Sequence, residues 1–311
     1  MTEVERIISS GLVSPDFLKE EVIDGCLVSE NTKKLWVVLL DLLKEVDRIC
    51  KKHNLKYFLG AGTLIGAVRH KGFIPWDDDI DLFMLRDDYE KLLEIGETEF
   101  KYPYFMQTPY TDKGTFFSFL RIRNSNTTMI DRAFKYEKFN QGCVLDIFPL
   151  DNCVLEGSLE RYNIIKELII ENATYMRLNN PFPSDNEMER KKKYLSKKRN
   201  QLEVNERIHS IASQFNNINT EHVILGTNTI VPFGTGTFPK SAFDKSIVVD
   251  FYGIKATIPA GYDEVLTIAY GDYMQMPPES ERYLRSNFFI DMDIPYKEYW
   301  DIENWDSIFP C

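Results

Sequence analysis

The chain has 311 residues, of which 43% are hydrophobic and 27% are charged, and its formal net charge is -11. This usage is ordinary for a globular protein and argues against a largely disordered chain. The acidic balance excludes a general nucleic-acid binder, because phosphate backbones select an excess of Lys and Arg. We therefore expect a folded protein with no nucleic-acid partner.

Three features of the sequence bear on the location of the protein. The N-terminus lacks the charged-then-apolar order of a secretory signal, and no stretch approaches the roughly 18 apolar residues of a membrane span. The five cysteines are odd in number and widely spaced, unlike a disulfide framework or a paired zinc knuckle. We expect a cytoplasmic protein, and the sequence leaves peripheral contact with the inner face of the membrane open.

The first half of the chain is predicted to be an α/β core. Apolar residues recur at three- and four-residue steps from Thr32 to His53, which predicts an amphipathic helix capped by Asn31 or Thr32. The next predicted elements are a strand at 55–59, a glycine turn at 60–63, a helix at 64–68, a strand at 80–84, a helix at 86–100 and strands at 104–107, 116–123 and 142–148.

The second half begins with two predicted long helices, at 159–178 and 187–215, and ends with strand and turn signals. A hairpin is predicted from 246–250 and 254–258, and a helix at 262–270. The predicted organisation is an N-terminal helical segment at 1–54, a core with the site at 55–155, a helical insertion at 156–218 and a C-terminal α/β segment that completes the core at 219–311.

The acidic cluster at 77–81 is the clearest functional signal. If 80–84 is a strand, its period of two places Asp79 and Asp81 on one face. Two such carboxylates repel each other unless a cation lies between them, and hard oxygen ligands select Mg²⁺ or Mn²⁺. Apolar neighbours on both sides argue against a solvated acidic turn, and Leu82 occupies the position at which a calcium loop requires glycine. The cluster therefore predicts a catalytic metal site.

Residues upstream of the cluster are candidates for binding phosphate. Gly62 and Thr63 lie where a strand gives way to a helix, so backbone N–H groups and the Thr63 hydroxyl are predicted to bind a phosphate group. Arg69, His70 and Lys71 follow and are candidate charge partners of a polyphosphate. Their ordinary alternative is a plain surface position.

A third carboxylate, Asp146, lies in an apolar strand-like run, where an unpaired charge is costly. Either a structural partner satisfies it, or it joins the metal site and accepts the proton of an acceptor hydroxyl. The sequence leaves both readings open.

The stretch from Tyr57 to Tyr89, YFLGAGTLIGAVRHKGFIPWDDDIDLFMLRDDY, resembles the signature of the LicD family, which includes the fukutin-related proteins. Further similarity lies at 144–151 and 262–278. The resemblance implies an α/β (α+β) fold with a nucleotidyltransferase-like mixed sheet flanked by helices, here with a helical insertion. It matches Gly62 and Thr63 to the phosphate-binding turn, Asp79 and Asp81 to the metal-binding pair, and Asp146 to the third acidic residue.

The resemblance also implies an activity. Bacterial members with this pattern place phosphocholine from CDP-choline on teichoic acid, lipopolysaccharide or related glycans, whereas fukutin-related members use CDP-ribitol. We therefore expect a Mg²⁺- or Mn²⁺-dependent phosphocholine transferase with a glycan or lipid-linked glycan acceptor. Transfer of another phospho-alcohol such as ribitol phosphate and conventional nucleotidyl transfer are the alternatives, and a non-enzymatic metal-binding module is the least favoured.

Four details complete the expectations. Trp76 is a candidate to hold a quaternary ammonium group on its ring face, with core packing as the ordinary alternative. Phe83 stands where the family more usually has a smaller residue, which predicts an altered pocket floor. The basic run 190–199 would suit anionic lipid or a polyanionic acceptor, although a solvated helix face is more common. No structural zinc is predicted.

Overall fold

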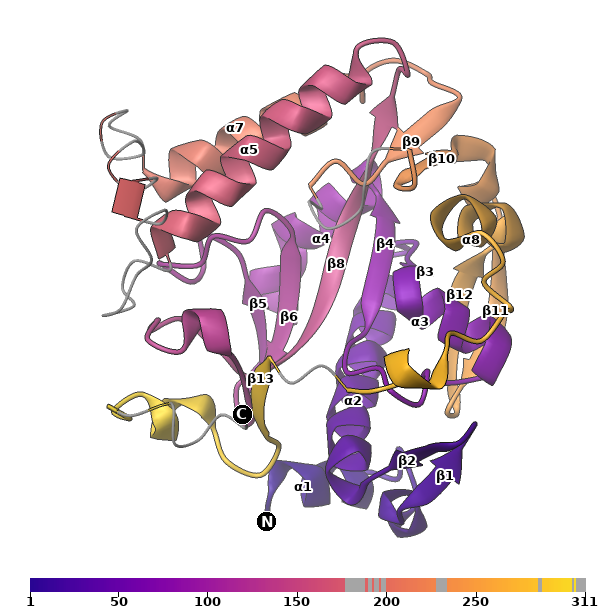
Figure 1. Ribbon diagram of the computed structural model, residues 1–311, viewed down its shortest axis with the longest axis vertical. Coiled ribbons are helices and arrows are strands. Elements are labelled where there is room, and N and C mark those ends of the chain that lie inside the picture. Colours follow the sequence, from indigo (N-terminus) through magenta and orange to yellow (C-terminus); the bar gives the residue numbers. More distant parts are fainter. Residues whose placement is uncertain are drawn as a thin grey trace.

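The computed structural model describes residues 1–176, 188, 189, 192, 196, 200–227, 234–284, 287–303 and 305. Their architecture is a curved mixed sheet with helices on both sides (Figure 1), which confirms the predicted mixed α/β fold. Within the described residues the main sheet has seven strands. They are β3 (Phe58–Leu59), β4 (Asp81–Leu85), β5 (Tyr104–Gln107), β6 (Leu120–Asn124), β8 (Cys143–Cys153), β9 (His222–Ile224) and β10 (Thr237–Pro239).

Strand β8 organises this sheet because it is long enough to pair with three neighbours. On one edge, β8 pairs with β4 in parallel, and β4 pairs on its other side with β3 in the antiparallel direction. The other edge pairs with β6 along its first half and with β9 at its last residues. The outer strands are β5, which pairs with β6, and β10, which pairs with β9.

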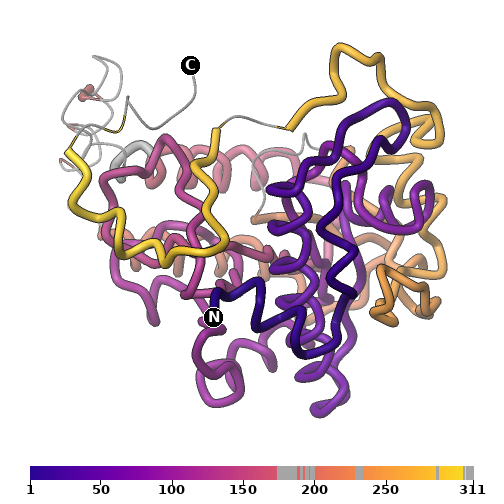
Figure 2. Tube along the Cα trace, turned by 90° about the horizontal axis from the view of Figure 1, so that it is seen from below, coloured from indigo at the N-terminus to yellow at the C-terminus, as the bar shows by residue number. Residues whose placement is uncertain are grey.

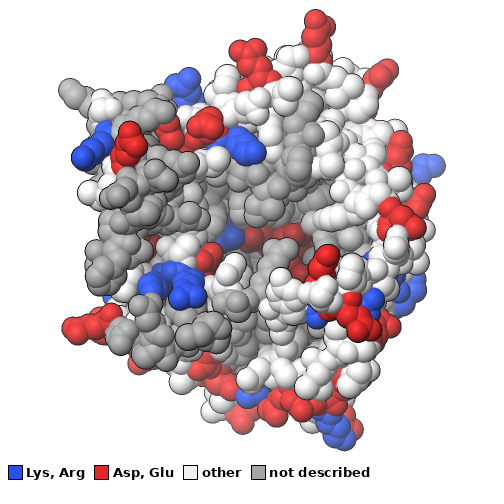
Figure 3. Space-filling model, in the orientation of Figure 1, with Lys and Arg blue, Asp and Glu red and all other residues white. Residues whose placement is uncertain are grey.

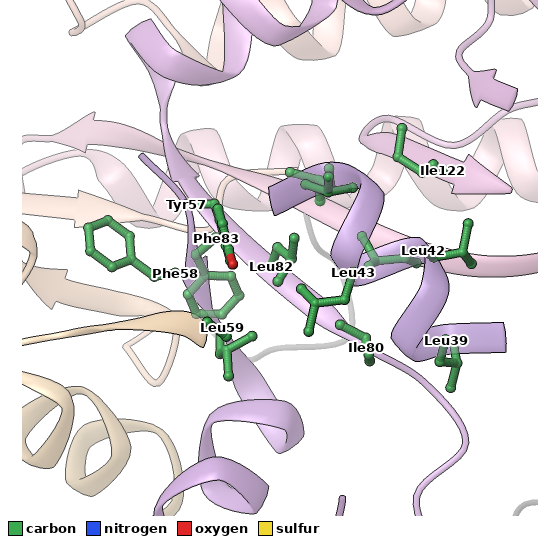
Figure 4. Packing of buried hydrophobic residues seen from close by; sticks show 14 of the residues in the cluster. Leu39, Leu42, Leu43, Tyr57, Phe58, Leu59, Ile80, Leu82, Phe83 and Ile122 are labelled. Atoms are coloured by element: carbon green, nitrogen blue, oxygen red, sulfur yellow. The ribbon is translucent and has the colours of Figure 1, made fainter. Parts of the chain in front are cut away.

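Helices α2 (Glu30–Lys52) and α4 (Arg86–Glu99) cover one face of the sheet. Helix α2 begins after Ser29, whose hydroxyl accepts the Thr32 N–H at 3.2 Å, so the predicted cap at Asn31 or Thr32 was wrong by two or three residues. Ile80 and Leu82 pack with leucines of α2 in the buried core (Figure 4). Because side chains alternate along a strand, Asp81 points to the opposite face.

Within the segment predicted as a helical insertion, α5 (Ser158–Met176) and α7 (Gln201–Ala212) share a small apolar core. The single helix predicted at 187–215 was wrong at Asn200. This residue is extended, and its side chain accepts the Glu203 N–H at 2.8 Å while Glu203 accepts its backbone N–H, so a capping box starts α7 afresh. Within the basic run 190–199, the structure describes Lys192 and Ser196, and both are exposed. The other residues of the run lie outside the described residues.

The remaining elements flank the sheet. The predicted hairpin is confirmed as β11 (Ser246–Phe251) and β12 (Ile254–Pro259), and the predicted helix is α8 (Tyr262–Tyr270). Figure 2 shows the N-terminal hairpin, formed by β1 (Glu21–Ile23) and β2 (Cys26–Val28), beside the segment that follows α8. The other elements are α1 (Glu3–Ser9), η1 (Pro15–Leu18), α3 (Ala61–Ile65), the π-helical turn η2 (Gly66–His70), β7 (Thr128–Asp131), η3 (Arg132–Phe134), η5 (Lys240–Phe243), η6 (Glu279–Glu281), β13 (Phe288–Asp291) and η7 (Tyr296–Tyr299).

The described helices include none with both the length and the apolar character needed to span a membrane.

Candidate active site

Three adjacent strands place charged residues in one row across the sheet. The parallel register of β4 and β8 sets Asp81 opposite Asp146, and the antiparallel register of β6 and β8 sets Arg121 opposite Asp146. Residues paired across strands point to the same face, so all three lie on the face opposite α2. Figure 3 shows a hollow in this side of the molecule with acidic side chains on its floor and a basic side chain beside them.

Arg121 forms a two-pronged ion pair with Asp146. A terminal nitrogen of Arg121 donates a hydrogen bond to Oδ2 at 2.9 Å, and Nε lies 2.9 Å from Oδ1 as an ion-pair contact without hydrogen-bond geometry. The guanidinium carbon is 3.4 Å from the ring centroid of Phe117 and 5.1 Å from that of Phe119, so aromatic rings hold it in place. The charged hydrogen bond to Oδ2, together with the close Nε contact, orients the Asp146 carboxylate.

Sequence reasoning missed Arg121. A signal was present, because the run 120–123 alternates apolar and basic residues within a predicted strand, which directs Arg121 to a single face. Which face that is, and that Asp146 lies opposite, follows only from the register of β6 with β8.

The carboxylate cluster has an excess of negative charge. Burial and the neighbouring carboxylates of Asp79, Asp146 and Asp77 raise the pKa of Asp81 well above its usual range, and Arg121 opposes this only in part. Carboxylate oxygens of Asp77, Asp78 and Asp79 lie within 4.8 Å of one another. A set of oxygen ligands with surplus negative charge is what Mg²⁺ or Mn²⁺ requires, so these residues fit such an ion.

The cluster differs in two respects from the predicted arrangement. Strand β4 begins at Asp81, so Asp79 precedes the strand and is brought to the cluster by the turn in which the Asp77 N–H donates to the Ile74 carbonyl at 2.9 Å. Asp77, which lies outside the predicted metal-binding pair, contributes its own carboxylate to the cluster.

Gly62 and Thr63 lie directly against this cluster, in α3. The Thr63 side chain is buried, and its hydroxyl accepts the Asp81 backbone N–H at 2.9 Å. A Cβ atom at Gly62 would lie 3.0 Å from Oδ2 of Asp77, so glycine gives this carboxylate the room to approach. These contacts position the aspartates; the binding of phosphate by the two residues stays a prediction.

Arg69 and Lys71 are directed elsewhere. A terminal nitrogen of Arg69 donates to the carbonyls of Tyr273 at 2.6 Å and Gln275 at 3.2 Å, which ties η2 to the loop after α8. Lys71 is exposed, and its ammonium group donates to the Val68 carbonyl at 2.8 Å. Both side chains donate to backbone carbonyls outside the carboxylate cluster. Their predicted role with a polyphosphate stays a prediction.

His70 and Trp76 lie next to each other beside the N-terminal hairpin. Nε2 of His70 is 3.3 Å from Oδ2 of Asp24, and burial, with a smaller effect of the Arg69 charge, lowers the His70 pKa. The rings of His70 and Trp76 are 6.1 Å apart, and the Arg282 guanidinium lies 5.8 Å from the Trp76 ring centroid. A cation already faces this tryptophan, which counts against its use for a quaternary ammonium group.

Phe83 is buried in the core, and the predicted change to the pocket floor stays a prediction. Its side chain is buried between the rings of Phe148 and Phe238, and it lies over Gly60, where a Cβ atom would be 2.5 Å from the ring. The absence of a side chain at Gly60 therefore leaves room for the Phe83 ring.

Carboxylates on neighbouring strands, next to a short helix that follows a glycine turn, define a nucleotidyltransferase-type site. Residues 54–158 match the family model described as LicD/FKTN/FKRP, nucleotidyltransferase domain. The chain is also 30% identical over 267 residues to the lipopolysaccharide cholinephosphotransferase LicD of Haemophilus influenzae, a match that covers 79% of this chain and 92% of that protein. The protein therefore belongs to the LicD family.

Shorter similarities lie in two uncharacterized rickettsial proteins. One, from Rickettsia prowazekii, is 41% identical over 73 residues, which is 24% of this chain and 25% of that protein. The other, from Rickettsia typhi, is 42% identical over 57 residues, which is 18% of each chain.

Proposed function

We propose that this protein transfers phosphocholine from CDP-choline to a hydroxyl of a cell-surface glycan, such as teichoic acid, lipopolysaccharide or a lipid-linked precursor, and releases CMP. The match to a lipopolysaccharide cholinephosphotransferase along most of both chains supports the transferred group and the glycan acceptor. The observation that carries the proposal is the row of Asp81, Asp146 and Arg121 beside the carboxylates of Asp77 and Asp79. We place the reaction in the cytoplasm or at the inner face of the membrane, where nucleotide-linked donors are made.

Asp79, Asp81 and Asp146 would hold Mg²⁺ or Mn²⁺, with Asp77 beside them. When bound, the ion would neutralise the donor diphosphate and stabilise the charge that develops on the transferred phosphoryl group. The protein supplies the geometry: Thr63 fixes the Asp81 backbone, and Arg121 fixes the Asp146 carboxylate.

The reaction is a displacement at phosphorus. The oxygen of the acceptor hydroxyl forms a bond to the phosphorus that carries choline, and the bond from that phosphorus to the bridging oxygen of CMP breaks. The hydroxyl proton passes to a site carboxylate or to water. Asp146 accepts a hydrogen bond from Arg121 through Oδ2, which orients its carboxylate and leaves lone pairs available to a metal ion. We therefore assign Asp146 to ligand binding and orientation.

One incubation tests the function. The whole protein is mixed with Mg²⁺ or Mn²⁺, a candidate glycan, and either CDP-choline or CDP-ribitol; CMP and the modified glycan are measured. We expect equimolar CMP and phosphocholine-bearing glycan from CDP-choline, and none after chelation of the metal.

Other outcomes would replace the proposal. Turnover with CDP-ribitol alone would assign a different alcohol, and nucleotide transfer from a nucleoside triphosphate would assign a conventional nucleotidyltransferase. Turnover that survives both Asp79→Asn and Asp81→Asn would refute the metal site.

A further inference from the structure

A pocket of about 210 Å³ lies between α4, the loop after β5 and α7. Four aromatic side chains line it, together with one carboxylate and one imidazole: Tyr89, Tyr110, Phe117, Phe119, Glu97 and His209. An apolar cavity of about 150 Å³ accepts a benzene-sized ligand. The pocket is therefore large enough for a small organic group.

Two of the aromatic residues connect the pocket to the catalytic row. Phe117 and Phe119 line the pocket and also flank the guanidinium group of Arg121. The ring of Phe119 is 4.4 Å from that of Phe148, which lies two residues along β8 from Asp146. Two residues of a strand span about 7 Å, so the pocket begins a short distance from the catalytic carboxylates.

The charges around the pocket favour a cation. Burial, and secondly the charge of Arg86, lower the pKa of His209 to about 4, so its imidazole is neutral near pH 7. Of the lining residues that the structure describes, Glu97 alone is then charged. The Tyr110 hydroxyl donates to Oε1 of Glu206 at 3.3 Å, which adds a second carboxylate at the rim.

Two arginines touch pocket rings, but each is matched by a carboxylate. Arg121 over Phe117 pairs with Asp146, and Arg86, 5.1 Å from the Tyr89 centroid, pairs with buried Asp151. Aromatic rings with nearby carboxylates bind quaternary ammonium groups.

We propose that this pocket binds the trimethylammonium head of the choline donor. Phe117 and Phe119 would then link recognition of the head group to the orientation of Asp146 through Arg121. This inference rests on the proposed function, because it concerns the alcohol that the donor carries, and it assigns donor specificity to the pocket rather than to Trp76.

Binding experiments with matched ligands test the charge requirement. Isothermal titration calorimetry of the whole protein compares choline with its uncharged isostere 3,3-dimethylbutan-1-ol and with ribitol. We expect choline to bind at least about fivefold more tightly than the isostere. Glu97→Gln should reduce this preference by about fivefold without changing the affinity for the isostere. Glu94→Gln, also exposed on α4 but outside the pocket lining, is the matched control and should change neither.

Kinetics test whether the pocket serves the donor. Tyr110→Ala removes an exposed ring of the pocket wall and should raise KM for CDP-choline by about fivefold, with little change in kcat. Inhibition by CDP, which lacks choline, should be unchanged. Thermal unfolding of each variant shows that the fold is retained.

The possible failures are distinguishable. Failure of wild-type protein to prefer choline, or pocket variants that leave CDP-choline kinetics unchanged while phosphocholine transfer persists, would overturn the pocket but not the function. A rise in KM for the glycan instead would assign the pocket to the acceptor. Selective choline binding without transfer from CDP-choline would support the pocket and reject the proposed function.

Discussion

Strand β8 contributes the aspartates of two arginine–aspartate pairs, five residues apart, and the pairs differ in their surroundings. In the first pair, Arg121 and Asp146 have side chains that are 15% and 17% exposed, on the hollowed face of the sheet. In the second, Arg86 and Asp151 are 6% and 0% exposed, with both nitrogen–oxygen distances at 2.7 Å.

The difference lies in the balance of charge. The Asp151 carboxylate also accepts a hydrogen bond from the Asn216 side chain at 2.7 Å. Its charge is balanced by Arg86, and these bonds join β8 to α4 and to the chain after α7. Asp146 faces Asp81 and its neighbouring carboxylates, which one arginine does not neutralise. An arginine–aspartate pair thus stabilises the fold at Asp151, where the charges balance. At Asp146, where carboxylates are in excess, such a pair belongs to the candidate active site.

The largest effect is expected from Asp81→Asn. It removes a ligand from the catalytic cluster and should lower kcat/KM by about 10³-fold or more. Because the variant also removes repulsion among carboxylates, its melting temperature without metal should rise. CMP release and thermal unfolding measure the two effects. Asp87→Asn, an exposed position on α4, is the control and should show neither; full activity in Asp81→Asn would contradict the assignment.

Asp151→Asn tests the balanced pair. Removal of one partner leaves Arg86 buried without its carboxylate, which should cost about 3–5 kcal/mol in the free energy of unfolding. Urea denaturation measures this loss, and kcat per folded molecule should be nearly unchanged. The double variant with Arg86→Met should lose less than the sum of the single variants. A loss below 1 kcal/mol (roughly the value of a surface pair) would contradict the structural role.

Arg121→Met should lower kcat by about 10- to 100-fold while KM for the donor stays the same, because the variant releases the Asp146 carboxylate from its fixed orientation. Arg121→Lys should restore only part of the rate, since an amine lacks the two-pronged geometry. The free energy of unfolding should fall by about 3 kcal/mol, because the variant leaves Asp146 beside other carboxylates without its cation. A large rise in KM instead would show that Arg121 binds the donor phosphate.

The smallest effect concerns pH and His209, whose Nδ1 lies 3.2 Å from a nitrogen of Arg86. Its pKa is lowered from 6.5 to about 4 in the folded protein, chiefly by burial. Between these values the unfolded chain binds a proton that the folded chain does not, so stability falls as pH decreases from about 6.5 toward 4. The loss should be about 2 kcal/mol at pH 5. Urea denaturation at pH 7.5 and 5 measures it, and a His209→Gln variant with an equally steep loss would contradict this origin.

Features encoded by local sequence were predicted well. The helix at 262–270 and the hairpin before it follow from apolar spacing and turn residues, and the acidic cluster with its preceding glycine turn is a continuous segment. The break at Asn200 was missed, although its capping box is also local, because the polar, helix-favouring residues on both sides suggested one continuous helix.

By itself, the sequence determined the family, the mixed α/β fold and the acidic segment, since these depend on residue type and spacing along the chain. Only the tertiary structure decided which distant residues meet that segment. The registers of β4, β6 and β8 bring Asp81, Asp146 and Arg121 into one row, and the packing of α4 and α7 encloses the aromatic pocket. Pairing between strands far apart in sequence depends on the packing of the whole sheet, which local composition does not specify.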